Sequence, residues 1–236
     1  MPRDATGIGE GAAPVDHEAR DLVAFHGLFG AAAALALWVP APVPSGLRIA
    51  GLVVAYNVAL PWAARAWGYP AWWVLWTFLL PLSVCQVLPD FFLARALGTL
   101  VFPADGGPRI GPVSASMAGL WVIPLFLTVR GAERVASTLG RPAAAYPAAA
   151  VIGLAIFAAS EATLWAIPLW HARGVWTVAH VAVYVLPAEA LLGPATVYAF
   201  RQVAARPWPA RAMAAVPVSL TYLGALCAGY LVLAGR

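Results

Sequence analysis

The sequence predicts an all-α fold, a polytopic membrane helical bundle of about seven transmembrane helices. Hydrophobic residues make up 62% of the 236 residues, charged residues make up 10%, and the mean hydropathy is +0.81. The apolar residues fall in runs that cover a hydrocarbon core of about 30 Å at about 1.5 Å per helical residue. Short segments rich in proline and glycine separate these runs, as expected for loops between spans.

Residues 1–20 are polar, lack the basic start and apolar core of a cleavable signal, and are predicted to be a flexible tail. Residues 21–236 are predicted to form a single seven-helix transmembrane domain. The third span has the least distinct end, because residues 91–101 either extend it or lie along the membrane interface. The predicted spans are 22–40, 47–66, 71–93, 113–131, 145–169, 175–200 and 212–234. Turn-forming residues divide them at 40–46, 68–70, 103–112, 140–142, 172–174 and 206–209.

The arginines predict the orientation of the chain in the membrane. All fourteen basic side chains are arginine; nine lie on the side of the amino terminus and five on the opposite side. Cytoplasmic loops of membrane proteins carry an excess of basic residues. We therefore expect an integral protein of a bacterial-type inner or plasma membrane, surrounded by membrane lipids, with a cytoplasmic amino terminus and an external carboxyl terminus.

The composition excludes several classes of protein. A chain without lysine cannot hold a retinal Schiff base or form a lysine Schiff-base intermediate. No cysteine–histidine cluster and no paired DDxxD-type acids occur, so neither a zinc site nor a magnesium–diphosphate site is expected. The arginines are scattered, which argues against nucleic acid as a partner. We expect no metal and no cofactor, and the oligomeric state stays open.

Three carboxylates, Asp90, Glu161 and Glu189, lie inside predicted spans. A charge at the centre of a bilayer costs roughly 3 kcal/mol on insertion scales, so an acid at that depth indicates a functional site. An enclosed carboxyl group tends to keep its proton and can donate it to an apolar substrate. Topology places these acids toward the external ends of their spans, with Glu189 near the middle of the sixth, and predicts a polar pocket open to the outer leaflet.

Each acid also has a structural interpretation. Asp90 follows Pro89 near a span end, where its carboxylate can meet headgroups or water. Glu161 can hydrogen-bond a neighbouring helix. Glu189 can form an ion pair with an arginine at depth, but it is the strongest candidate, because Pro187 is expected to disturb the helix and free carbonyl groups beside a cavity.

Polar and aromatic side chains supply candidate substrate-binding residues. Ser83, Gln86 and Asp90 share one helical face, and His180 and Tyr184, four residues apart, share another. Aromatic faces can stabilise carbocations, and hydrogen bonds between helices or ordinary core packing are the alternative roles. The candidates are Asn57, Gln86, Trp121, Trp165, His180 and Tyr184.

Two stretches of the chain run similarly. The first has Asp90, a Gly-Pro hinge at 107–108 and a proline-bearing segment at 118–124; the second has Glu161, Trp176 and the segment 184–189. Paired repeats around a central site are common in membrane bundles. An internal repeat over this part of the chain is one interpretation of the similarity, and a chance likeness is the other.

The acid near a span end, the tryptophan hinge and the Leu-Pro-x-Glu element resemble the integral-membrane lycopene cyclase domains and the related carotenoid hydratases. Glu161, Trp176 and residues 186–189 carry this resemblance, which covers about residues 85–200. Small membrane terpene cyclases of meroterpenoid pathways are similar in size, span number and paired acids. Ala188 stands where lycopene cyclases usually have the first of two adjacent acids.

The resemblance implies cofactor-independent chemistry on a lipophilic isoprenoid, begun by protonation of an alkene or epoxide and ending in cyclisation or hydration. In this hypothesis Glu161 or Glu189 donates the proton, and the other acid or Asp90 stabilises the cation or removes the final proton. Two alternatives stay open: a proton- or cation-coupled transporter of small molecules, and a non-catalytic membrane subunit.

Overall fold

The computed structural model describes residues 15–164 and 169–234, and their fold is that of an all-α polytopic membrane protein. The chain divides into two compact units, one ending at Val39 and the other beginning at Pro40. Helix α1 (Val15–Trp38) belongs to the first unit. Residues 15–20, predicted to be tail, are the first turns of this helix, and the single domain predicted from residue 21 divides after α1.

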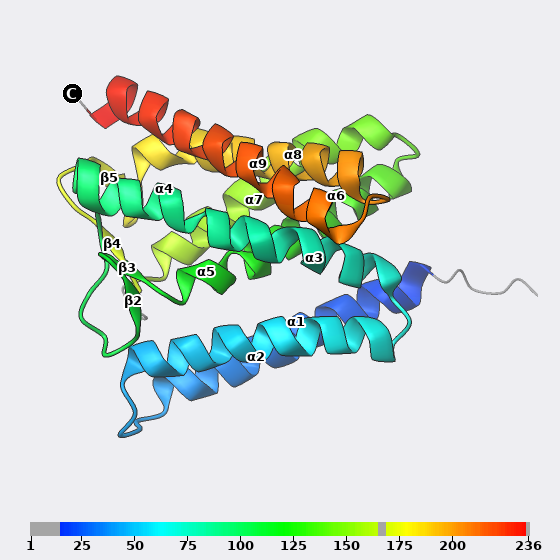
Figure 1. Cartoon of the computed structure of the whole chain (residues 1–236), viewed down its shortest axis with the longest axis horizontal. Coiled ribbons are helices and arrows are strands. Elements are labelled where there is room, and N and C mark those ends of the chain that lie inside the picture. The colour runs from blue at the N-terminus through cyan, green and yellow to red at the C-terminus, as the bar shows by residue number, and fades with distance from the viewer. Residues whose placement is uncertain (1–14, 165–168, 235–236) are drawn as a thin grey trace, which may run out of the picture. The chain divides into compact units, whose positions relative to one another are not determined.

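The second unit contains the other helices and six short strands (Figure 1). Its α-helices are α2 (Ser45–Ala66), α3 (Pro70–Cys85), α4 (Val87–Phe92), α5 (Met117–Leu120), α6 (Val122–Thr138), α7 (Ala145–Ala162), α8 (Leu186–Val203) and α9 (Trp208–Gly229). Shorter turns extend them: η1 (Leu93–Leu97) follows α4, η2 (Pro142–Ala144) precedes α7, η3 (Val183–Val185) precedes α8 and η4 (Tyr230–Ala234) follows α9.

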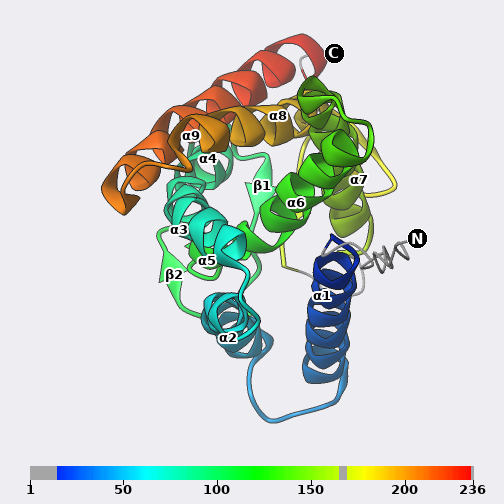
Figure 2. The same cartoon turned by 90° about the vertical axis from the view of Figure 1, so that its right-hand side faces the viewer.

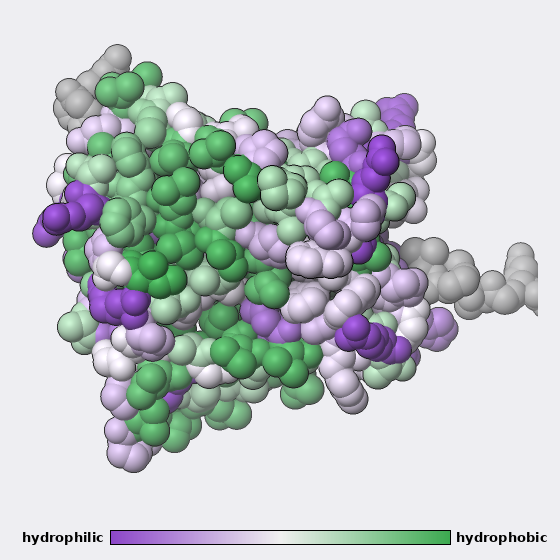
Figure 3. Space-filling model, viewed as in Figure 1, coloured by the Kyte–Doolittle hydropathy of each residue, from purple (hydrophilic) through white to green (hydrophobic). Residues whose placement is uncertain are grey.

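Helix length and composition confirm the membrane prediction. Within the described residues, six helical segments are long and apolar enough to cross a bilayer: 17–38, 45–66, 70–97, 142–162, 183–203 and 208–233. Figure 3 shows hydrophobic residues along the middle of α3, α4 and α9, with the most hydrophilic residues toward the helix ends. The predicted fourth span, 113–131, is not among these six: helix covers 117–120 and 122–138 there, and this segment is not long and apolar enough to cross a bilayer.

Helices α3, α9, α8, α7 and α6 pack in that order into a closed ring, in which α6 returns to α3 (Figure 2). Small residues allow the closest approach. A Cβ atom on Gly193 of α8 would collide with the carbonyl oxygen of Ala149 on α7. Close backbone approach at small residues is how membrane helices gain packing energy without a hydrophobic driving force.

The predicted sixth span, 175–200, is wrong in its first part. Residues 177–182 form a hairpin of β5 (Thr177–Val178) and β6 (Val181–Ala182), and α8 begins only at Leu186. Ala179 and His180 form the turn with φ values of 49° and 70°, the positive values of a two-residue hairpin loop. The valines and the threonine of this segment favour strand. Pro187 lies in the first turn of α8, where a missing N–H costs nothing, so it breaks no helix.

The predicted internal similarity corresponds to a repeated order of elements. Strand β1 (Leu100–Val101) and the hairpin of β2 (Arg109–Ile110) and β3 (Val113–Ser114) lie between α4 and α5; β4 (His171–Ala172) and the β5–β6 hairpin lie between α7 and α8. Strands β1 and β4 pair antiparallel, with Leu100 opposite Ala172 and Val101 opposite His171. Equivalent strands that pair in this way indicate a local two-fold relationship between the repeats.

Spacing relates the acids of the two repeats. Asp90 stands ten residues before the start of β1, and Glu161 stands ten residues before the start of β4. Trp121 stands twelve residues after the start of β2, and Glu189 stands twelve residues after the start of β5. Asp90 is therefore equivalent to Glu161, and Trp121 to Glu189. We name the part of the second unit that holds the strands, at the left of Figure 1, the hairpin end.

Candidate functional site

The three predicted acids gather at the hairpin end, although they lie on separate helices. Asp90 is in α4, Glu161 is in the last turn of α7, and Glu189 is in the first turn of α8. Asp90 is 4% exposed and Glu189 3%, whereas Glu161 is half-buried. In the part of the chain that the structure describes, none of the three forms an ion pair. Glu189 therefore does not form the ion pair with an arginine that was its structural alternative.

Asp90 is held by an indole. The Nε1–H of Trp121, at the junction of α5 and α6, donates a hydrogen bond of 3.2 Å to Asp90 Oδ2. The indole ring lies 5.3 Å from the ring of Phe157 and 5.7 Å from that of Tyr222, measured between centroids. Asp90 thus faces the aromatic interior of the bundle, rather than headgroups or water.

Tyr222 of α9 is the residue that sequence reasoning missed. Its side chain is 4% exposed, and its ring centroid lies 5.7 Å from that of Trp121, the indole that binds Asp90. The signal in the sequence was weak: Ser219 and Tyr222 are polar residues three positions apart on one face of an apolar helix. Both are buried in the structure, and Tyr222 belongs to the aromatic surroundings of the Asp90–Trp121 hydrogen bond.

Glu161 is bound by the second hairpin. The backbone N–H of Ala182 in β6 donates to Glu161 Oε2 at 3.3 Å. Glu189 Oε2 is buried without a hydrogen-bond partner among the described residues. A buried polar atom without a partner is costly, so this oxygen marks a place for a proton, a water molecule or a ligand.

Tyr184, predicted to be a substrate-binding residue, is buried in η3, just before α8. Its hydroxyl and that of Thr99 form a hydrogen bond of 2.8 Å, and its ring centroid lies 5.7 Å from that of Tyr230. Tyr184 precedes α8 in the second repeat, and Thr99 follows η1 in the first. The bond therefore ties the two repeats together.

The predicted polar face of the third span is confirmed. Ser83, Gln86 and Asp90 are all buried. The hydroxyl of Ser219 lies 3.0 Å from Gln86 Oε1 and 2.9 Å from the carbonyl oxygen of Cys85. Gln86 Nε2 has no hydrogen-bond partner in the described part of the chain. One turn from Asp90, this amide adds an unused donor to the site.

Three other residues were predicted to bind the substrate, and the structure does not place them at the site. Asn57 Nδ2 donates to the carbonyls of Val53 and Gly119 at 2.9 and 3.1 Å. Its Oδ1 accepts from Trp76 at 3.2 Å, so this amide joins α2, α3 and α5. His180 is exposed in a hairpin turn, so the helical face predicted for His180 and Tyr184 is wrong. Trp165 lies outside the described residues.

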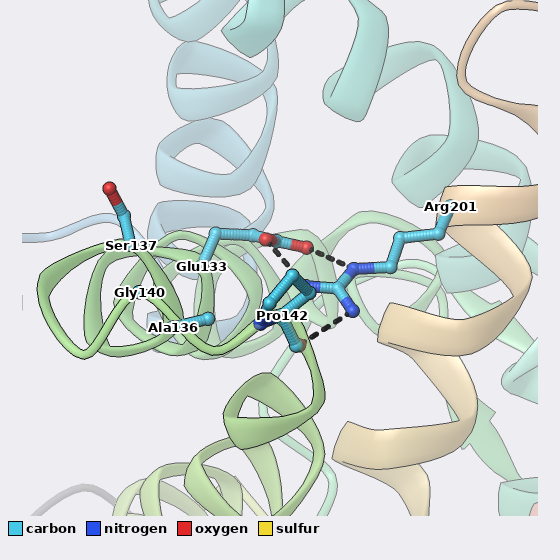
Figure 4. Close-up of a pocket in the computed structure, with 6 residues that line it drawn as sticks. All are labelled: Glu133, Ala136, Ser137, Gly140, Pro142 and Arg201. Atoms are coloured by element: carbon cyan, nitrogen blue, oxygen red, sulfur yellow. Dashed lines mark hydrogen bonds and ion pairs between the residues drawn. The ribbon is translucent and has the colours of Figure 1, made fainter.

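A pocket of about 330 Å³ lies away from the acids, where α6 ends and α7 begins (Figure 4). Arg201 of α8 binds Glu133 of α6 there through two N–H···O contacts of 2.8 Å. Its third nitrogen donates to the carbonyl of Pro142 at 2.9 Å. These bonds occupy the guanidinium and the carboxylate, and they connect three elements at this end of the bundle.

The hairpin end combines proton-bearing groups with aromatic rings. Buried carboxyl groups can act as general acids or bases, and aromatic faces attract cations. Among the described residues, no group of three or more histidine, cysteine, aspartate or glutamate side chains could hold a metal ion. The arrangement therefore suits proton transfer to and from an apolar molecule.

Comparison with curated proteins and with solved structures finds no match. Residues 87–233 match a family described as domain of unknown function DUF6989. The matched segment is more than half of the chain and contains Asp90, Trp121, Glu161, Glu189 and Tyr222. The chain therefore belongs to the DUF6989 family.

Proposed function

We propose that this protein is an integral-membrane enzyme that modifies an isoprenoid by acid-initiated cyclisation or hydration, without a cofactor. The observation that supports this proposal most strongly is Asp90, a buried acid of a membrane bundle that is bound by Trp121 beside the ring of Tyr222. Two further acids, Glu161 at the end of α7 and Glu189 at the start of α8, lie at the same end of the bundle. The resemblance of Glu161, Trp176 and residues 186–189 to lycopene cyclases and carotenoid hydratases points to the same chemistry.

The reaction follows from the groups present. A protonated carboxyl donates its proton to an alkene carbon or an epoxide oxygen, which leaves a carbocation on the substrate. The faces of Trp121, Tyr184 and Tyr222 stabilise that positive charge. The reaction ends when a carboxylate removes a proton from the cation, which gives a cyclised alkene, or from an added water molecule, which gives an alcohol.

The membrane setting suits a substrate that partitions into lipid. A long isoprenoid reaches the bundle through the bilayer, so the protein needs no aqueous channel for it. Burial excludes bulk water, which would otherwise quench the cation early. The polar donors Gln86 and Glu189 lie next to the aromatic groups and orient the reacting end of the substrate.

Expression in an isoprenoid-producing host tests the proposal, with lipid extracts compared between the wild type, Glu189→Gln and Glu161→Gln. We expect a new isoprenoid product from the wild type and none from either variant, although both remain folded in detergent. Glu133→Gln is the matched control, because it removes a carboxylate at the opposite end of the bundle and should retain the product. Full activity in both site variants would exclude the mechanism.

One observation favours a second candidate, a proton- or cation-coupled carrier. Many transporters consist of repeats with a binding site between them. Here the acids belong to two repeats whose strands β1 and β4 pair. A carrier would move its substrate across the membrane of proteoliposomes and leave it chemically unchanged. An enzyme would convert the substrate in detergent without a gradient, and a non-catalytic subunit would do neither alone.

A further inference from the structure

A buried amide lies one helical turn from Asp90. Gln86 stands at the junction of α3 and α4, and its side chain is 0% exposed. Its Nε2 has no hydrogen-bond partner among the described residues. An amide nitrogen carries two N–H donors, and a buried donor without an acceptor is costly. The side chain of Gln86 therefore calls for an acceptor that the described part of the chain does not supply.

Ser219 of α9 holds the other end of this amide. The Ser219 hydroxyl oxygen lies 3.0 Å from Gln86 Oε1 and 2.9 Å from the carbonyl oxygen of Cys85, and the Ser219 side chain is 2% exposed. The oxygen and nitrogen of an amide diverge from one carbon atom, so a contact at Oε1 turns Nε2 away from the hydroxyl. Ser219 thus fixes the orientation of the amide and presents its N–H donors on the opposite side.

The aromatic groups of the site lie next to this amide. Gln86 and Asp90 are four residues apart at the start of α4, and Ser219 and Tyr222 are three residues apart on α9, so each pair shares one helical face. Trp121 donates to Asp90 and packs against the ring of Tyr222. The Gln86–Ser219 contact and the group of Asp90, Trp121 and Tyr222 therefore form two adjacent layers, one helical turn apart.

The equivalent position in the second repeat has no polar group. Gln86 precedes Asp90 by four residues, and Phe157 precedes Glu161, the equivalent of Asp90, by four residues. Phe157 is 6% exposed, and its ring centroid lies 5.3 Å from that of Trp121. Packing at this position is therefore satisfied by an apolar side chain. A buried polar group that packing does not require, inside a membrane helix, indicates a binding role.

We propose that Gln86 Nε2 donates a hydrogen bond to an oxygen atom of the substrate, which is therefore an oxygenated isoprenoid, such as an epoxide or a ketone, and not a hydrocarbon. This inference rests on the proposed function and specifies its substrate class. An epoxide or ketone oxygen accepts hydrogen bonds and donates none, which matches the unpaired N–H groups. A hydrocarbon of the same shape would leave them unsatisfied, so the site discriminates against it.

Binding to the purified full-length protein in detergent tests this assignment with squalene and its terminal epoxide, which differ by one oxygen atom. The rise in unfolding temperature over a concentration series gives the two affinities. We expect the ratio of epoxide to squalene affinity to be about tenfold larger in the wild type than in Gln86→Met, which has an apolar side chain of similar length. Gln202→Met, at an exposed position of α8, is the matched control and should keep the wild-type ratio. Equal ratios in the wild type and Gln86→Met, or no binding of the epoxide to the wild type, would overturn the assignment.

Ser219→Ala provides a second measurement in case Gln86→Met does not fold. Loss of the hydroxyl releases the amide, so the ratio should fall while the affinity for squalene stays the same, and an unchanged ratio would contradict the assignment. Binding needs no turnover. A wild type that prefers the epoxide through Gln86 but forms no isoprenoid product would refute the proposed function and leave the oxygen-binding site intact. Product formation that depends on Glu161 and Glu189, without a preference for the epoxide, would overturn this inference alone.

Discussion

Trp121 and Asp90 are joined by a hydrogen bond of 3.2 Å that connects the junction of α5 and α6 to α4. The ring of Trp121 also packs against Tyr222 of α9, which belongs to neither repeat. One indole therefore orients an acid of the first repeat and packs against a tyrosine of α9. The site exists only when the ring of helices has closed.

Replacement of Trp121 by phenylalanine should lower turnover about ten- to hundredfold, because Asp90 loses its N–H donor, which is worth about 1.5–3 kcal/mol when the acceptor is charged. The aromatic packing on Phe157 and Tyr222 is retained. Product formation and thermal unfolding in detergent measure the two effects. Trp76→Phe removes an indole bond to Asn57 outside the site and should lower stability without reducing turnover. Equal losses of turnover in both variants would indicate a structural role for Trp121.

Replacement of Tyr222 by phenylalanine should lower turnover but keep the protein folded, because the ring still packs on Trp121 while the buried hydroxyl group of the site is lost. Product formation and thermal unfolding in detergent measure the two effects. Tyr198→Phe on the exposed face of α8 is the control and should change neither. A Tyr222→Phe enzyme with normal turnover would remove the Tyr222 hydroxyl from the reaction.

Replacement of His180 by glycine should retain full turnover and raise the stability by up to about 1 kcal/mol, because the relief of left-handed strain, about 1–2 kcal/mol, exceeds the extra conformational entropy that glycine loses on folding, about 0.5–1 kcal/mol. His180 occupies a turn position with φ of 70°, which glycine adopts without strain. Thermal unfolding and product formation in detergent check both statements. If turnover fell while stability rose, His180 would have a role in the reaction that its exposed position does not suggest.

Replacement of Gly193 by alanine should destabilise the protein by about 1–3 kcal/mol, because the new Cβ atom meets the Ala149 carbonyl oxygen and forces α7 and α8 apart. Gly224→Ala in α9 is the matched control, since nothing lies within 4 Å of its added methyl group. That variant should be neutral or slightly stabilising, as alanine favours helix. Similar unfolding temperatures for the two variants would argue against the close contact of α7 and α8.

Local composition was enough to predict much of this fold. Span length and apolarity are properties of each segment, so the second span, predicted at 47–66, lies at 45–66. The alternation of spans placed Asp90, Glu161 and Glu189 toward the same end before any packing was known. The repeated order of acid, hinge and helix could be recognised for the same reason, since it is a property of the linear sequence.

Other features depended on packing between distant segments. A valine-rich run can form a buried strand or a helix, and the choice at 175–185 depended on the hairpin turn, which moved His180 to the surface and Glu189 to the start of α8. The contacts of Trp121 with Asp90 and Tyr222 depend on how each helix is rotated in the ring. Helix rotation is set by the fit of neighbouring surfaces, including small residues such as Gly193, and a span's own hydropathy carries almost no information about its neighbours.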